Sequence, residues 1–343
     1  MRFLFVSRIH DIEENKIRGS VDFTAQDPWR REGADGSPQI STSVVSEAIG
    51  QLVSWLSLRN NNFTARPVFL FASNIDLNGS IPAPSTVELE AWITGGDEES
   101  FVFSGTAKVD GEVVVAITDC GGYFMPLAEL EDPIVTRQRF TRLTSGAGPI
   151  NDSINDSTND STVPRKSAVS QVYGSRQLID DVKNIEIGRT IVAVKVMRQS
   201  EPFYADHFPR NPVTPIVVIN EMIGEATRMM MEGTEFSVQA KDDVASFMCK
   251  LKCKIRPVAV VDLKIKSFIL PGDTVVISVK KMGVLENEFE TIAEIVVNQK
   301  RILRGRYRYK IMDQIHQGLS KNMVNLDSSG RGDLCKLKNV ASS

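Results

Sequence analysis

The same order of hydrophobic and polar patterns occurs twice along this chain of 343 residues, on either side of one polar segment. Each copy begins with a short apolar stretch and a charged turn, at residues 3–23 and 179–197. A mostly apolar run of helical length then follows, at residues 41–58 and 214–231. Because these runs are apolar on nearly every side, they are typical of enclosed helices. We therefore predict one buried helix in each copy.

Alternation of apolar and polar residues follows each predicted helix and indicates β-strands. In the first copy we expect strands at residues 68–77, 85–93, 100–109 and 112–124. In the second copy we expect them at residues 246–255, 260–270, 273–282, 289–297 and 301–312. Asp110-Gly111 and Pro271-Gly272-Asp273 are typical turn sequences between such strands. The pattern predicts an α+β fold of two units, each an antiparallel sheet wrapped around a central buried helix, packed together as a pseudo-dimer.

The polar segment between the copies is SGAGPINDSINDSTNDSTVPRKS, in which Asn-Asp-Ser occurs three times. It has too few apolar residues to offset the entropy cost of ordering it, which favours a flexible linker. A second polar stretch begins near Gly318. The resulting domain prediction is a first domain at 1–133, a linker at 134–175, a second domain at 176–316 and a polar tail at 317–343.

Composition favours an ordinary globular protein, with 42% hydrophobic and 24% charged residues. The N-terminal residues do not resemble an export signal, and no apolar run has the length of a transmembrane helix. Four cysteines do not make a disulfide framework, and Cys249 and Cys253 lie in an alternating, strand-like pattern. We expect no metal site and a reducing cytoplasmic location.

The net charge of −3 is unevenly distributed, because acidic residues predominate before residue 147 and basic residues after it. An acidic partner would therefore meet the second half. Drift of charge on solvated faces explains the imbalance equally well.

The segment EPFYADHFPRNPVTPIVVINEMIGE, residues 201–225, contains one of the three histidines immediately before the second predicted helix. It resembles the signature of the bacterial 3-hydroxyacyl-[acyl-carrier-protein] dehydratases, which have the hotdog fold. The matching residues are Glu201, Pro202, Phe203, His207, Phe208, Pro209, Pro212, Pro215, Val217 and Glu221. Arg210 and Ile216 depart from this signature, since the family has glycine at both positions.

The resemblance implies loss of water from a 3-hydroxyacyl thioester, as in fatty-acid or polyketide-like biosynthesis. A histidine removes the C2 proton and a carboxylic acid protonates the departing hydroxyl. In the family, these two groups come from different protomers. Alignment of the two copies places Pro28 opposite His207 and Glu47 opposite Glu221. We therefore predict that His207 pairs with Glu47 across the halves, with Glu221 as the less favoured candidate acid.

Further residues follow from the resemblance. We expect substrate binding by Phe208, Pro215, Ile216 and Gln51. The implied partner is acyl carrier protein bearing the substrate on phosphopantetheine, with docking charges at Arg210, Lys250, Lys252 and Lys254. No cofactor and no nucleic acid are implied, and two such chains could form a homodimer.

Two other functions remain open from the sequence. A hotdog thioesterase would hydrolyse the thioester with an acid and a water, although such enzymes lack the HFP signature. A non-catalytic acyl-binding or acyl-carrier subunit would fit the loss of both glycines and the missing histidine of the first copy.

Overall fold

Twelve strands form one continuous antiparallel sheet in the computed structural model, which describes residues 3–32, 37–146, 178–232 and 254–312. The first half of the sheet has the order β1 (Arg8–Ile12), β2 (Lys16–Phe23), β6 (Ser85–Gly96), β7 (Ser100–Val109), β8 (Glu112–Pro126) and β5 (Ala65–Asp76). The second half continues with β11 (Lys254–Ile265), β14 (Lys300–Met312), β13 (Glu288–Val297), β12 (Thr274–Leu285), β10 (Thr190–Val196) and β9 (Asp181–Glu186).

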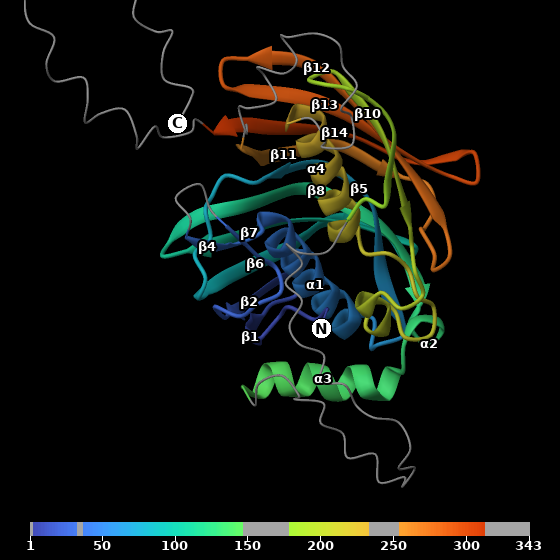
Figure 1. Ribbon diagram of the computed structural model, residues 1–343. Helices are drawn as coiled ribbons and strands as arrows, with labels where there is room; N and C mark the ends of the chain where they lie inside the picture. The colour runs from blue at the N-terminus through green and yellow to red at the C-terminus, as the bar shows by residue number, and fades with distance from the viewer. Residues whose placement is uncertain (1–2, 33–36, 147–177, 233–253, 313–343) are drawn as a thin grey trace, which may run out of the picture. The chain divides into compact units, whose positions relative to one another are not determined.

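The two half-sheets mirror each other around the junction of β5 and β11. In this junction Asn74 pairs with Val261 and Ala72 pairs with Leu263. Each half-sheet curves around its own helix, as Figure 1 shows. The predicted pair of hotdog units is thus confirmed, and both halves belong to one compact unit, Met1–Met312.

The predicted hairpin at Asp110-Gly111 is present between β7 and β8. Both residues have positive φ angles, 51° and 83°. This is the backbone of a two-residue turn whose twist matches that of the flanking strands. Gly272, in the other predicted turn, has a φ of 93°.

The central helices are α1 (Thr42–Asn60) and α4 (Ile216–Glu232). Helix α1 is enclosed, because its residues from Thr42 to Leu58 are buried except Ser46. Helix α4 is buried on one side only, and on its other side Arg228 forms ion pairs with Glu225 and Glu232. These charges at i, i+3 and i+4 spacing form a polar stripe, so the prediction of a fully enclosed helix holds for α1 but not for α4.

Smaller elements complete both halves. The first half contains β3 (Arg30–Glu32), β4 (Pro38–Ile40), α2 (Leu127–Leu130) and α3 (Pro133–Ser145). The second half contains a short 3₁₀ helix, η2 (Pro202–Ala205). Strands β3 and β4 pair with each other outside the main sheet.

Helix α3 begins one residue before the predicted linker at 134–175, so the first part of that segment is helical. Its N-cap Asp132 accepts hydrogen bonds from the backbone N–H groups of Ile134 and Val135, and Pro133 occupies the first helical turn. An acidic N-cap followed by proline is a strong start signal, but the helix has little apolar periodicity by which to predict it. Residues 147–175 and the predicted tail lie outside the described residues. None of the helices that are described is long and apolar enough to cross a membrane.

We expect Leu56→Ala in α1 to lower the free energy of unfolding by about 2–5 kcal/mol, because it leaves a cavity under the sheet. The Leu56 side chain is 0% exposed. Urea unfolding followed by circular dichroism measures the change. Leu270→Ala is the matched control: its side chain is 45% exposed, and we expect a change within about 0.5 kcal/mol. Equal losses in the two variants would contradict the enclosure of α1.

Candidate active site

His207 begins a short loop, residues 207–213, that leads from η2 toward α4. Two hydrogen bonds close the base of this loop, which we call the His loop. The backbone N–H of Val213 donates to the carbonyl of His207 at 2.9 Å, and Nδ1 of His207 lies 3.0 Å from the carbonyl of Val213. Since a carbonyl only accepts, Nδ1 carries the proton, and Nε2 of a neutral ring is left as an acceptor.

Aromatic rings surround the imidazole of His207. Phe208 stacks on it with a centroid distance of 4.2 Å, and Phe3 meets it edge-on at 5.5 Å. Burial among these groups lowers the pKa of His207 to about 4, because the charged form loses hydration. The hydrogen bond to Val213 opposes this shift without cancelling it. His207 is therefore a neutral base at physiological pH.

Glu47 and Gln51 lie one turn apart on α1, and both are buried. The amide nitrogen of Gln51 donates to Oε1 of Glu47 at 3.2 Å and to the carbonyl of Phe3 at 3.2 Å. Its amide oxygen accepts from the N–H of Phe5 at 2.9 Å. Burial raises the pKa of Glu47 to about 7, although Gln51 and the charge of Arg66 oppose the shift. A substantial fraction of Glu47 is thus protonated near neutral pH.

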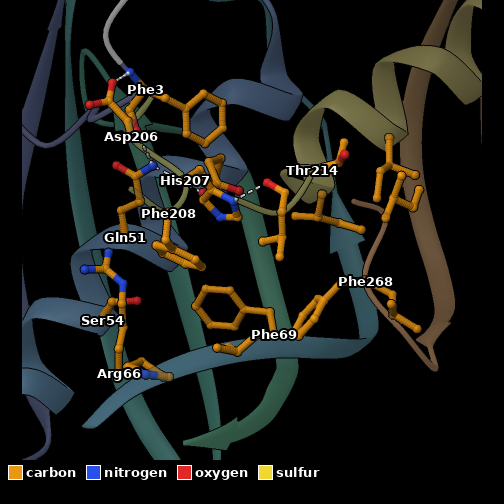
Figure 2. A pocket seen from close by; sticks show the side chains of 18 of the residues that line it. Phe3, Gln51, Ser54, Arg66, Phe69, Asp206, His207, Phe208, Thr214 and Phe268 are labelled. Carbon is orange, nitrogen blue, oxygen red and sulfur yellow. Dashed lines mark hydrogen bonds between the residues drawn. The ribbon is translucent and has the colours of Figure 1, made fainter. Parts of the chain in front are cut away.

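One pocket brings His207 and Glu47 together, although they come from different halves of the chain. Figure 2 shows Gln51, Ser54 and Arg66 on one side of His207 and Phe268 on the other. The lining residues are Phe3, Leu4, Glu47, Gln51, Ser54, Arg66, Pro67, Val68, Phe69, Asp206, His207, Phe208, Val213, Thr214, Ile216, Ile219, Ile265, Ser267, Phe268 and Ile269. The two residues that we predicted to pair across the halves therefore line the same pocket.

A second, more apolar cavity adjoins this pocket and shares Glu47, Phe69, Ile216 and Ile265 with it. It extends between the two halves and is otherwise lined by Ser46, Gly50, Phe71, Ala72, Ile75, Phe103, Ile117, Cys120, Asn220 and Leu263. Burial raises the pKa of the Cys120 thiol to about 12, so this thiol stays protonated. The lining of this cavity is mostly apolar.

Glu221, the other candidate acid, does not line the pocket. Its carboxylate accepts a hydrogen bond from the hydroxyl of Ser41 at 2.8 Å and forms an ion pair with Arg31. Both partners belong to the first half, close in sequence to Pro28. Glu221 thus occupies the position in the second half that corresponds, by the internal pseudo-symmetry, to that of Glu47 in the first.

The expected substrate-binding residues divide into two groups. Gln51, Phe208 and Ile216 line the pocket, whereas Pro215 does not. The carbonyl of Pro215 instead accepts hydrogen bonds from Val218 and Ile219 in the first turn of α4. Pro215 therefore contributes to the N-terminal end of α4.

Of the expected docking charges, Arg210 binds acceptors in the first half. Its side chain donates to the carbonyl of Ala128 and to the carboxylate of Asp132. Lys250 and Lys252, like Cys249 and Cys253, lie outside the described residues. Lys254 is the first residue of β11.

Several lining residues were not predicted from the sequence. Ser54 follows Gln51 by three positions on α1, so helical spacing could have indicated it. Phe3, Arg66 and Phe268 have no such signal, since each reaches the pocket from a segment distant from the motif. Arg66 also forms an ion pair with the buried Glu131.

The described residues contain no group of three or more His, Cys, Asp or Glu side chains that could hold a metal ion. The polar groups of the pocket suit proton transfer, because a neutral imidazole and a protonatable carboxyl line the same largely apolar enclosure.

Comparison with known proteins places the second half in a family. Residues 175–306 match the FabA-like domain. The chain is 30% identical over 115 residues to the 3-hydroxyacyl-[acyl-carrier-protein] dehydratase FabZ of Staphylococcus epidermidis, covering 33% of this chain and 70% of that protein. The chain belongs to this dehydratase family. It is also 25% identical over 138 residues to the FabZ of Clostridioides difficile, covering 40% of this chain and 87% of that enzyme.

Structural similarity extends over both halves of this dehydratase-family chain. A crystal structure of a Lactobacillus plantarum protein identified as an oleoyl thioesterase covers 87% of this chain and 97% of its own, with a TM-score of 0.50 and 11% identity. At that identity the similarity concerns the fold alone. The sequence likeness to the dehydratases lies in the second half, while the duplicated fold includes the first.

We expect the ring resonances of His207 to titrate with a pKa of about 4 in NMR spectra of the folded protein, because the enclosed ring resists protonation. A ¹H–¹³C titration from pH 3.5 to 8 measures it. His207→Gln identifies the resonance by its loss. A midpoint near the ordinary histidine value of about 6.5 would contradict the enclosure of the ring.

Proposed function

We propose that this protein dehydrates 3-hydroxyacyl thioesters carried by acyl carrier protein to trans-2-enoyl thioesters, as a hydro-lyase of fatty-acid or polyketide-like biosynthesis. The observation that carries the proposal is the shared pocket, in which His207 is a neutral base and Glu47 a carboxyl of raised pKa. Membership of the dehydratase family and the similarity to the FabZ enzymes support the substrate class.

The protonation states suit the two proton transfers of the reaction. Nε2 of His207 takes the proton from C2, and the electron pair of that C–H bond forms the C2–C3 double bond. The C3–O bond breaks while Glu47 donates its proton, so that the hydroxyl leaves as water. His207 is then cationic and Glu47 is a carboxylate. Transfer of a proton from the imidazolium back to the carboxylate, directly or through water, restores both groups.

Stabilisation of the thioester oxygen is assigned to the start of α4. Ile216 is the first residue of this helix and lines the pocket. The first N–H groups of a helix lack partners inside the helix and form its positive end. A thioester carbonyl at this position would gain stabilisation as negative charge develops on its oxygen. The backbone N–H acts in this role, so the isoleucine side chain does not remove it.

The apolar cavity beside the pocket accommodates the acyl chain in this proposal. Ala72, Ile75 and Ile117 provide hydrocarbon walls for it. Burial of each methylene contributes about 0.8 kcal/mol to binding. Since Glu47 stands where the cavity and the pocket meet, C2 and C3 of a bound substrate would lie near both proton-transfer groups.

We expect His207→Ala and Glu47→Gln each to lower kcat for dehydration by about 10²- to 10⁴-fold, because each removes one proton-transfer group. Absorbance of the enoyl thioester measures the product. The matched control is Glu221→Gln, which alters a buried glutamate outside the pocket and should retain activity. Full activity in His207→Ala would refute the enzyme proposal, and an inactive Glu221→Gln beside an active Glu47→Gln would refute the cross-half pair.

The same assay distinguishes the other functions. Release of free carrier thiol without enoyl product identifies a thioesterase. Saturable binding of the acyl carrier without turnover identifies a non-catalytic acyl-binding subunit.

We expect a bell-shaped pH dependence of kcat/KM with limbs near pH 4 and pH 7. Below the pKa of His207, about 4, the base is protonated, and above the pKa of Glu47, about 7, the acid is ionised. Initial rates across pH 3.5–9 measure the profile. In Glu47→Gln the residual rate should lose the limb near pH 7. Persistence of that limb in the variant would assign it to another group.

A further inference from the structure

Arg210 stands at the tip of the His loop and is bound to the other half of the chain. Its backbone N–H donates to the carbonyl of Leu130 at 2.9 Å. Its guanidinium donates to the carbonyl of Ala128 at 2.8 Å and to Oδ2 of Asp132 at 3.0 Å. All three acceptors lie at the junction of α2 and α3 in the first half.

A second contact joins the His loop to the end of α2, through Phe208 and Leu130. Phe208 packs with Leu130, Val68 and Val213 in a small apolar cluster that is separate from the main core. The guanidinium of Arg66 lies 5.2 Å from the centre of the Phe208 ring. Arg66 is in turn paired with Glu131. Residues 127–132, which we call the clasp, therefore hold the His loop both by its aromatic ring and by its tip.

The exposed Arg210–Asp132 ion pair contributes little on its own, since the side chains are 46% and 44% exposed. The bonds to the backbone of Ala128 and Leu130 add direction, because carbonyls that are fixed in a helix define where the guanidinium and the loop must lie. We therefore expect removal of the Arg210 side chain to change the position of the His loop more than the free energy of unfolding.

We propose that Arg210 is a positioning residue, which through the clasp fixes His207 relative to the half of the chain that supplies Glu47. This inference rests on the proposed function. Base and acid come from different halves, so their separation depends on contacts between the halves. A misplacement of about 1 Å can lower the rate about 10²-fold. Two of the side-chain nitrogens of Arg210 already bind first-half acceptors, which favours this role over docking of the carrier protein.

The test is Arg210→Gln, assayed with a 3-hydroxyacyl thioester of pantetheine, which has no carrier protein. We expect kcat to fall about 10- to 100-fold with KM changed less than about threefold. Arg210→Lys should recover part of the loss, because one ammonium can replace the ion pair but not both bonds. The control is Arg189→Gln, an arginine that is exposed and paired with Glu186 away from the pocket, for which we expect unchanged kcat.

Asp132→Asn tests the clasp from its other side, because it removes the charge opposite Arg210 while keeping an oxygen to cap α3. We expect its effect on kcat and that of Arg210→Gln to be non-additive in the double variant. A kcat of Arg210→Gln within twofold of the wild type overturns the proposal. So does a rise confined to KM for the acyl-carrier substrate, which would assign Arg210 to docking.

A readout independent of turnover separates this inference from the proposed function. The His207 ring resonances should shift and broaden in Arg210→Gln and Asp132→Asn but not in Arg189→Gln. If the wild type shows no dehydration, the proposed function fails, and the clasp is judged by these spectra alone. Unchanged His207 resonances in both clasp variants then overturn it.

Discussion

The antiparallel pairing of β5 with β11 joins the two half-sheets, and the pocket between the halves depends on it. It removes one exposed edge from each half-sheet and brings α1 and α4 into contact. Phe69 on β5 and Ile265 on β11 line both the pocket and the apolar cavity beside it. Because both halves of the pocket belong to one chain, their assembly does not depend on protein concentration.

Burial produces opposite protonation states in the two central groups of the pocket. It disfavours charge on both, so it lowers the pKa of His207 and raises that of Glu47. The same apolar surroundings therefore give a free base and a protonated acid within one pH range. Gln51 opposes the rise in the pKa of Glu47 without cancelling it, and its contacts with the backbone of Phe3 and Phe5 hold in place the amide that donates to Glu47.

The pseudo-symmetry of the fold is broken at the second potential site. Glu221 corresponds to Glu47 in the alignment of the halves, yet it is bound by Arg31 and Ser41. The hydrogen-bond donor to Glu47 is instead the neutral amide of Gln51, in a largely apolar pocket that Arg66 also lines. Two glutamates on equivalent helices thus have different direct partners, because Glu221 is ion-paired with Arg31 whereas Glu47 accepts a hydrogen bond from a neutral amide.

The duplicated α+β architecture and both central helices could be predicted from the sequence, because they follow from local periodicity. The meeting of His207 and Glu47 was predicted from the resemblance to the dehydratase signature and from the alignment of the two copies. The contacts of Arg210 with Ala128 and Asp132 were not accessible in this way, since they join positions 82 and 78 residues apart. The same holds for Phe3, Arg66 and Phe268 in the pocket. These neighbours are seen only in the folded molecule, because contacts between distant segments depend on how the strands pair and on where the two halves meet.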